Sequence, residues 1–152
     1  GNEKLLPGIT QGTVCSSIVE LRDIMPTFLD FVKAPVPDSV DGKSMLPLVS
    51  HPEKEIRPYL HGEHSYGPYS NHWLASPEDK FIWYSETGTE QYFRTEEDPK
   101  ELKDEIGNPA YASRISYLRS ELVNMLKDRP EGFSNGKTLI PGRPYPPYLP
   151  QD

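Results

Sequence analysis

Four short apolar segments, separated by polar connections, lie in the middle of the chain. They cover 59–63, 72–75, 81–84 and 91–93, and each contains at least one aromatic residue. Short runs of this composition, bounded by turn residues, predict strands. The connections between the segments are short and contain Gly, Pro or acidic residues, which favours antiparallel neighbours over parallel crossovers. The pattern therefore predicts a four-stranded antiparallel sheet.

The apolar spacing changes to a helical period after residue 108. Apolar residues follow at intervals of four, three, four and three, on Tyr111, Ile115, Leu118, Leu122 and Met125. This stripe predicts one buried helix face, with Asn108 as N-cap and Pro109 at the first helical position. The polar positions are expected to face solvent: Arg114, Arg119, Glu121 and Lys127. Packing this C-terminal helix against the sheet buries both apolar faces, so we expect an α+β fold.

A shorter helical pattern precedes the strands. Ile24, Phe28, Phe31 and Val32 recur on one face, spaced for burial, and Asp23 lies where it could cap the helix. Ser44 could likewise cap a brief helix that runs to residue 49.

The tail, residues 139–150, is too rich in proline for a helix or a central strand. We expect an extended arm on the domain surface. A ligand for a proline-binding module is the alternative.

Composition and charge disfavour several classes of function. The 152 residues include 23 acidic and 16 basic side chains, for a net charge of −7. This surface disfavours binding to nucleic acid or anionic lipid, and no apolar run is long enough for a membrane span. The single cysteine, Cys15, excludes an internal disulfide. The chain begins with Gly1 and shows no signal peptide, which indicates nothing about where the protein is located.

Three separated blocks carry a family resemblance. They are residues 21–30 with 41–44, then 57–64, then 80–84 with 90–93 and 98–101. In this order and spacing they resemble the C-terminal region of bacterial arylsulfatase-type sulfatases, of the alkaline-phosphatase-like superfamily. The resemblance implies that residues 1–50 end the catalytic domain. Residues 51–152 would form the C-terminal subdomain with its proline-rich tail.

Two runs depart from the family pattern, at 92–95 and at 76–79. Both changes fall on turn and surface positions. They bear on the subfamily rather than on the fold.

The resemblance also implies which parts of the chemistry lie elsewhere. Sulfatases of this type use a formylglycine, made from a Cys/Ser-x-Pro-x-Arg motif, and a divalent cation, usually calcium. Cys15 is followed by Ser-Ser-Ile-Val, and no paired Asp or Asn cluster is present for the metal. We therefore expect no catalytic residue, metal or cofactor in this chain. Calcium and formylglycine are expected in the missing N-terminal part of the parent, and the chain alone is expected to be inactive.

The implied partner is the parent's own N-terminal catalytic domain. An apolar face around Ile24, Phe28 and Phe31 would be exposed where that domain belongs, and the chain alone could dimerise through it. The parent would act on a sulfated glycan or an aryl sulfate and would be periplasmic or secreted. Two alternatives stay open: a free-standing carbohydrate- or protein-binding module, and the back part of a related phosphoesterase.

The run from His61 to His64, with His72 nearby in sequence, is the main chemical candidate. Zinc needs at least three convergent ligands. On a strand, His61 and Glu63 face one side and His64 the other, so no metal site is predicted. His61 or His64 could instead reach the substrate cleft, where Gly62 would allow a close approach. Ordinary hydrogen bonding at the sheet edge is the alternative.

Aromatic residues near this run could stack on a sugar ring. Trp73 and Trp83 lie in predicted strands, and Trp83 is expected in the core because its strand is the most apolar. Tyr66 and Tyr69 flank Gly-Pro in a predicted loop and are expected to be exposed. The substrate-cleft candidates are therefore His61, His64, Tyr66 and Tyr69. Scattered basic residues are assigned no role: Arg22, Lys43 and Arg143.

Overall fold

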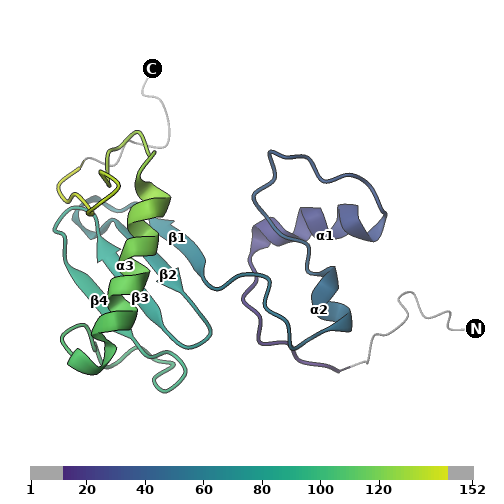
Figure 1. The fold of residues 1–152 in the computed structure, drawn as a ribbon, viewed down its shortest axis with the longest axis horizontal. Coiled ribbons are helices and arrows are strands. Elements are labelled where there is room, and N and C mark those ends of the chain that lie inside the picture. The colour runs from purple at the N-terminus through teal and green to yellow at the C-terminus, as the bar shows by residue number, and fades with distance from the viewer. Residues whose placement is uncertain (1–11, 144–152) are drawn as a thin grey trace, which may run out of the picture. The chain divides into compact units, whose positions relative to one another are not determined.

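The computed structural model describes residues 12–143, and the chain forms two compact units that divide between Leu60 and His61. Figure 1 shows the helices of the first unit and the sheet with its helix in the second. The sequence places the domain boundary at residues 50 and 51, and the structural divide falls ten residues later. Most of the proline-rich tail lies outside the described residues.

The first unit contains a 3₁₀ turn and two short helices, η1 (Leu21–Asp23), α1 (Ile24–Phe31) and α2 (Leu46–Ser50). Both helices begin within a few residues of the predicted positions. The Ser44 hydroxyl accepts a hydrogen bond from the Leu46 amide (3.2 Å), which supports the start of α2. Asp23 lies at the N-cap position of α1, as predicted, but its side chain makes no hydrogen bond to the helix amides.

Asp23 instead lies at the centre of the first unit. Both guanidinium NH₂ groups of Arg57 donate to its carboxylate (2.6 and 2.5 Å), and the amides of Glu20 and Lys43 donate as well (2.8 Å each). Burial of the carboxylate acts to raise its pKa, but these four hydrogen bonds outweigh burial and lower the pKa of Asp23 to about 2. The residue that the sequence reads as a cap is therefore the anchor of a long-range ion pair.

The apolar residues of α1 are exposed. Phe28 is 67% exposed, Ile24 43% and Phe31 41%, and Val32, just after the helix, is 65% exposed. The interpretation of this stripe as a buried face is therefore wrong for the chain as it stands. Exposure of Ile24, Phe28 and Phe31 agrees instead with the expectation that a further domain covers them.

The second unit is built on one sheet with strand order β1-β2-β3-β4. The strands are β1 (Leu60–His64), β2 (Asn71–Ala75), β3 (Lys80–Tyr84) and β4 (Glu90–Phe93). Each lies within a residue or so of its predicted position. Pairing is antiparallel, with His72 opposite Trp83 across β2 and β3, and Phe81 opposite Tyr92 across β3 and β4. The predicted four-stranded antiparallel sheet is confirmed.

Helix α3 (Ala112–Leu126) crosses one face of this sheet, as Figure 1 shows. It follows the 3₁₀ turn η3 (Pro109–Tyr111), whose first turn is capped by the Asn108 side chain accepting from the Ala110 amide (3.0 Å). The predicted α+β packing is confirmed, and the core between the layers consists of fully buried apolar side chains: Leu74, Phe81, Trp83, Tyr92, Leu118, Leu122 and Leu126.

The end of the predicted helix stripe is wrong by one residue. Leu126 is buried at 1% exposure, whereas Met125 is 43% exposed. A step of four from Leu122 keeps the side chain on the face toward the sheet, and that face also includes Val123. The polar face also differs from the prediction, because two of its arginines bind the sheet.

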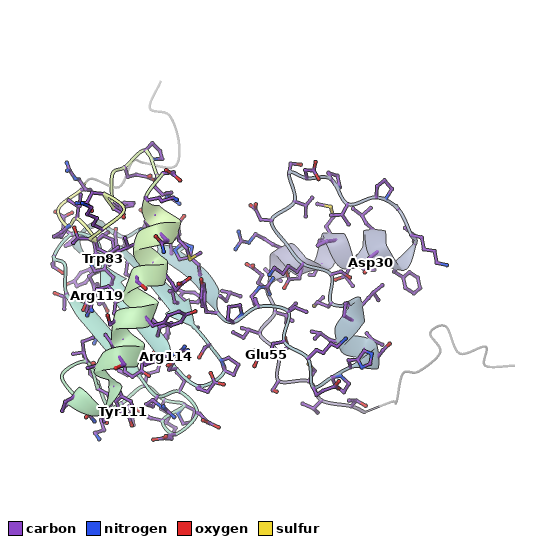
Figure 2. The ribbon with its side chains drawn as sticks, viewed as in Figure 1. Asp30, Glu55, Trp83, Tyr111, Arg114 and Arg119 are labelled. Atoms are coloured by element: carbon purple, nitrogen blue, oxygen red, sulfur yellow. The ribbon has the colours of Figure 1, made fainter. Side chains whose placement is uncertain are left out.

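Arg114 and Arg119 project from α3 over the sheet (Figure 2). Arg114 donates two hydrogen bonds to the Asp79 carboxylate (2.7 and 2.9 Å), and Arg119 donates two to Glu90 (2.7 and 2.6 Å). The expectation that these arginines only face solvent is therefore wrong. Each bidentate pair joins α3 to a residue at the end of a strand and so fixes the position of the helix along the sheet.

The described part of the tail packs against the second unit. The Ile140 amide donates to the Phe133 carbonyl (2.8 Å), and the Gly142 amide donates to the Ser85 carbonyl (2.9 Å). Residues 140–143 form neither helix nor strand, and residues 141–143 are exposed, in line with the prediction of an arm on the domain surface. Within residues 12–143, no helix combines the length and the apolar character that a membrane crossing requires.

Candidate functional site

Three aromatic rings lie in a row where β1 leads into β2. The His64 and Tyr66 rings are 6.1 Å apart between centroids, and the Tyr66 and Tyr69 rings are 6.2 Å apart. Tyr66 is 67% exposed and Tyr69 64%. We call residues 65–70 the tyrosine loop. Three of the four cleft candidates therefore come together on one exposed surface.

The tyrosine loop is held by its own short-range geometry. Its centre is the 3₁₀ turn η2 (Gly67–Tyr69), in which Gly67 has a φ of 50°, a conformation that favours glycine. The Ser70 hydroxyl accepts a hydrogen bond from the Tyr66 amide (2.9 Å), and the Ser85 amide donates to the Ser70 carbonyl (2.9 Å). These contacts tie the loop to the end of β3, so both tyrosine rings are presented by a fixed backbone.

A hollow lies on each side of Pro68. The first, of about 390 Å³, is lined by Tyr69, Tyr84, Gln91 and two threonines of the β3–β4 turn. The Tyr84 hydroxyl donates to the Gln91 side-chain oxygen (2.9 Å). The second hollow, of about 340 Å³, is lined by Ser65, Ser85, Glu86 and Arg143 among others. The first offers aromatic faces beside a polar amide, and the second offers hydroxyls beside one cation and one anion.

His61 lies apart from this row. It faces the side of the sheet that carries α3, where its Nε2 lies 3.2 Å from Nδ1 of His72. On the other side of β1, the Trp73 indole covers Gly62 so closely that a Cβ there would lie 2.0 Å from a ring carbon. The close approach expected at Gly62 is therefore made by the protein's own Trp73.

His72 is fully buried between aromatic rings. Its ring lies 4.9 Å from Phe133 and 5.9 Å from Trp83 between centroids. Burial and, to a smaller extent, the neighbouring His61 lower the pKa of His72 to about 4, against the opposing effect of Glu63. His72 is therefore a neutral imidazole at neutral pH. The expectation that Trp83 belongs to the core is confirmed, since it is 2% exposed.

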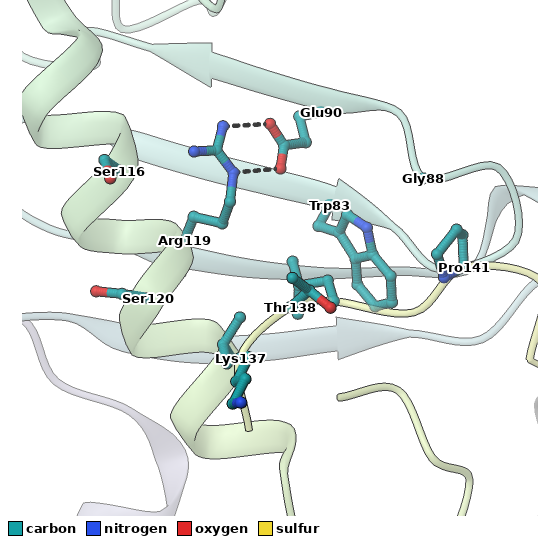
Figure 3. Close-up of a pocket in the computed structure, with 11 residues that line it drawn as sticks. Trp83, Gly88, Glu90, Ser116, Arg119, Ser120, Lys137, Thr138 and Pro141 are labelled. Carbon is teal, nitrogen blue, oxygen red and sulfur yellow. Dashed lines mark hydrogen bonds and ion pairs between the residues drawn. The ribbon is translucent and has the colours of Figure 1, made fainter. Parts of the chain in front are cut away.

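A further hollow of about 330 Å³ lies between α3 and the β3–β4 turn (Figure 3). Its wall includes the Arg119–Glu90 ion pair, drawn with dashed lines, and the edge of Trp83. Lys137 and Thr138 come from the segment after α3. Because Arg119 already donates two hydrogen bonds to Glu90, we assign this hollow to packing of the tail rather than to ligand binding.

Comparison with known proteins decides the family. Residues 4–128 match the family described as N-sulphoglucosamine sulphohydrolase, C-terminal. The chain belongs to this family. It is a sulfatase C-terminal region, as the sequence blocks indicated.

Two curated relatives support this assignment. The chain is 47% identical over 134 residues to an arylsulfatase of Clostridium perfringens, covering 88% of this chain and 28% of the relative. It is 35% identical over 113 residues to human arylsulfatase K, covering 63% of this chain and 20% of the relative. The chain thus spans about a quarter of the length of these relatives.

Solved structures show the same fold. A 2-O GAG sulfatase matches with a TM-score of 0.59 and 26% identity, over 69% of this chain and 24% of the other. A protein solved in complex with its substrate, D-glucosamine-2-N,6-O-disulfate, matches with a TM-score of 0.61 and 23% identity, over 69% of this chain and 23% of the other. A phosphonate monoester hydrolase from Silicibacter pomeroyi matches with a TM-score of 0.62 and 22% identity, over 79% and 27%. At identities below 25%, the last two likenesses concern the fold alone.

The residues of this sulfatase C-terminal region do not fit the formylglycine and calcium that the family implies. The sequence contains no Cys/Ser-x-Pro-x-Arg motif. Among residues 12–143, the one cluster of three potential metal ligands contains two histidines and one glutamate. Calcium prefers six or more oxygen ligands, so this cluster does not suit it. Residues 12–143 therefore offer no set of side chains suited to these two groups.

Sequence reasoning missed Tyr84, gave Arg143 no role, and noted His72 only as a neighbour of His61 in sequence. Tyr84 and Arg143 line the two hollows, and His72 meets His61. Tyr84 could have been found, because the alternation of β3 puts it on the face opposite Phe81 and Trp83. Arg143 carries no local signal, because its position depends on how the tail packs.

Proposed function

We propose that this sulfatase C-terminal region completes a sulfuric ester hydrolase and forms one wall of its substrate cleft. The substrate would be a sulfated carbohydrate or an aryl sulfate. The catalytic nucleophile and calcium would come from the parent's N-terminal domain. The observation that carries the proposal is the exposed row of His64, Tyr66 and Tyr69 beside two hollows, in a chain that belongs to a sulfatase family.

The chemistry of the first hollow supports recognition of a sugar or aryl group. Aromatic faces pack on the apolar faces of a ring, and one such contact contributes about 0.5–1.5 kcal/mol beyond its area. Tyr69 and Tyr84 offer these faces, and Gln91 offers an amide for a hydroxyl. A mostly apolar hollow with a few polar groups is the usual form of a small-molecule site.

The second hollow supports recognition of a hydroxyl or an anion. Arg143 is the basic side chain that lines it. The net charge of −7 repels anionic substrates at long range, so a local cation is needed if a sulfated ligand is to approach. Glu86 lines the same hollow, and its negative charge limits the part of the hollow in which an anion can bind.

The exposed face of α1 supports a covalently linked partner. Phe28, Ile24 and Phe31 expose apolar surface on one helix, and a contiguous apolar patch on a soluble protein marks an interaction site. We infer that the parent's N-terminal catalytic domain covers this face, and that the isolated chain could dimerise through it. We further propose that the parent is periplasmic or secreted, which cell fractionation would test.

The test is to express the full reading frame and assay it on a panel of sulfated sugars and aryl sulfates. Tyr69→Ala should raise KM about tenfold for the preferred substrate while changing kcat little, since it removes a binding contact of about 1.4 kcal/mol. Tyr117→Ala is the matched control, because Tyr117 is an exposed tyrosine of α3 that lines neither hollow. Equal kinetics for Tyr66→Ala, Tyr69→Ala, His64→Ala and wild type would exclude the cleft role.

A related phosphoesterase is the second candidate, favoured by the fold likeness to a phosphonate monoester hydrolase. The same assay distinguishes the two when phosphonate and phosphate esters join the panel. The upstream nucleophile also separates them, since a Cys or Ser within Cys/Ser-x-Pro-x-Arg indicates a sulfatase. A reading frame that starts near residue 1 would instead favour a free-standing binding module.

A further inference from the structure

Three potential metal ligands meet on the α3 face of the sheet. His61 and Glu63 come from β1 and His72 from β2, and one ligand atom of each lies within 4.8 Å of the others. Nε2 of His61 is 3.2 Å from Nδ1 of His72, and Oε2 of Glu63 is 3.5 Å from that same nitrogen. His61 and Glu63 share this face because they are two residues apart on a strand.

These separations are those of ligands around a small ion. Two Zn–N bonds of about 2.0–2.1 Å at a tetrahedral angle place the nitrogens about 3.3–3.4 Å apart. The observed N···N and O···N distances lie within a few tenths of an ångström of that value. The two imidazole rings are nearly parallel, at 8°, so an ion bound by both nitrogens requires rotation of the half-buried His61 ring, while the buried His72 ring stays in place.

The cluster is also held in place by its surroundings. The His72 ring is buried between Trp83 and Phe133, and such packing restricts its rotation. Backbone pairing places β1 beside β2 in the sheet. Ligands held by neighbouring strands lose little conformational freedom when an ion binds, which favours affinity.

We propose that His61, Glu63 and His72 form a Zn²⁺ site, with water in the fourth position. Two histidines, one glutamate and a water are an established tetrahedral zinc set, and imidazole ligands disfavour calcium and magnesium. The ion would join β1 to β2 and stabilise the edge of the sheet next to the tyrosine loop. The proposal does not depend on the sulfatase assignment.

Arg129 is the group that opposes a cation here. Its guanidinium lies 3.1 Å from Oε2 of Glu63, but it also donates two hydrogen bonds to Glu131 (3.1 and 2.7 Å). Arg129 can therefore release Glu63 and keep a bidentate partner. Replacement of Arg129 removes a competing positive charge, so Arg129→Gln should bind Zn²⁺ several-fold more tightly than the wild type.

The experiment measures Zn²⁺ binding to the 152-residue chain by competition with a chromophoric chelator and by titration calorimetry. All variants carry Cys15→Ser, so that the thiol does not contribute. We expect one ion per chain, and a loss of affinity of at least about 100-fold in His61→Gln and in Glu63→Gln, since even outer-shell partners contribute 10–100-fold. His64→Ala is the matched control, because His64 is adjacent but faces the other side of β1. This variant should bind Zn²⁺ as tightly as the Cys15→Ser chain does.

Two further measurements keep the test independent of folding. Circular dichroism spectra of His61→Gln and Glu63→Gln should match the spectrum of the Cys15→Ser chain. His72 is not substituted, because it is buried and its loss could unfold the sheet. Co²⁺ in place of Zn²⁺ should give the intense visible absorption of a four-coordinate site, absent in Glu63→Gln. The proposal would be overturned if the Cys15→Ser chain showed no saturable Zn²⁺ binding, or if both His61→Gln and Glu63→Gln bound Zn²⁺ as tightly as that chain.

Discussion

Arg57 and Asp23, 34 residues apart, form a two-point ion pair at the centre of the first unit, with guanidinium nitrogens 2.5 and 2.6 Å from the two carboxylate oxygens. The Asp23 side chain is fully buried and that of Arg57 is 7% exposed. The pair joins the start of α1 to the segment just before the sheet. Because both charges are out of water, each depends on the other for stability.

Loss of one partner should therefore be costly. We expect Arg57→Ala to lower the free energy of unfolding of the first unit by about 3–5 kcal/mol, since it leaves the Asp23 carboxylate buried without its cation. Denaturant unfolding followed by circular dichroism measures this change. Arg22→Ala is the control: Arg22 pairs with Glu20 at the surface, and exposed pairs contribute little. Equal effects of the two substitutions would contradict the role given to Arg57.

The same pair predicts how stability depends on pH in acid. The pKa of Asp23 is lowered to about 2 in the folded chain, below its ordinary value of 3.8. The folded state thus favours the ionised form, and its contribution is fully present above about pH 4. It is lost as the pH falls toward 2, for a total of about 2 kcal/mol. Unfolding free energies measured from pH 5 to pH 2 should show this loss in the wild type and a smaller slope in Asp23→Asn.

Gly42 should tolerate no side chain. A Cβ at this position would lie 1.9 Å from the Arg22 carbonyl oxygen, a backbone atom that cannot rotate away. We expect Gly42→Ala to destabilise the first unit by about 1–3 kcal/mol or more, as overpacking does. Gly107→Ala provides the control, because a Cβ there would meet no atom within 4 Å. Thermal unfolding of both variants would show the difference, and an unchanged melting temperature for Gly42→Ala would refute the contact.

Tyr92 should contribute to the second unit through its hydroxyl. It donates to Oδ2 of the buried Asp79 (2.8 Å), which also accepts from Arg114 and Ser76. We expect Tyr92→Phe to cost about 1.5–3 kcal/mol, the range for a hydrogen bond to a charged group, without a change in volume. Tyr117→Phe, at an exposed position on α3, should leave the unfolding curve unchanged. A similar result for both variants would show that the Asp79 network does not need the Tyr92 hydroxyl.

The chain on its own should hydrolyse no sulfate ester. It belongs to a sulfatase family but contains no formylglycine motif. Assays of the 152-residue chain beside the full-length protein, with and without added calcium, test this directly. Turnover by the purified chain above that of a heat-denatured sample would show that a nucleophile has been overlooked.

Local patterns were enough to predict the elements of the second unit. Short aromatic and apolar runs between turns located all four strands, and the helical period located α3, because both signals lie within a single element. The Asn108 cap was also predictable, since a cap bonds its own helix. The exposed Tyr66 and Tyr69 followed from the Gly-Pro turn between them.

The sequence by itself thus determined the family, the sheet with its helix, and the tyrosine loop. Only the tertiary structure decided that the Asp23 side chain binds Arg57 instead of the α1 amides, that Arg114 and Arg119 bind the sheet, and that His72 meets His61. Each of these depends on which residues far apart in the chain become neighbours. The periodicity of the sequence predicts the face on which a side chain lies. Its partner depends on strand register and on the placement of the helix, and both are determined by the packing of the whole unit.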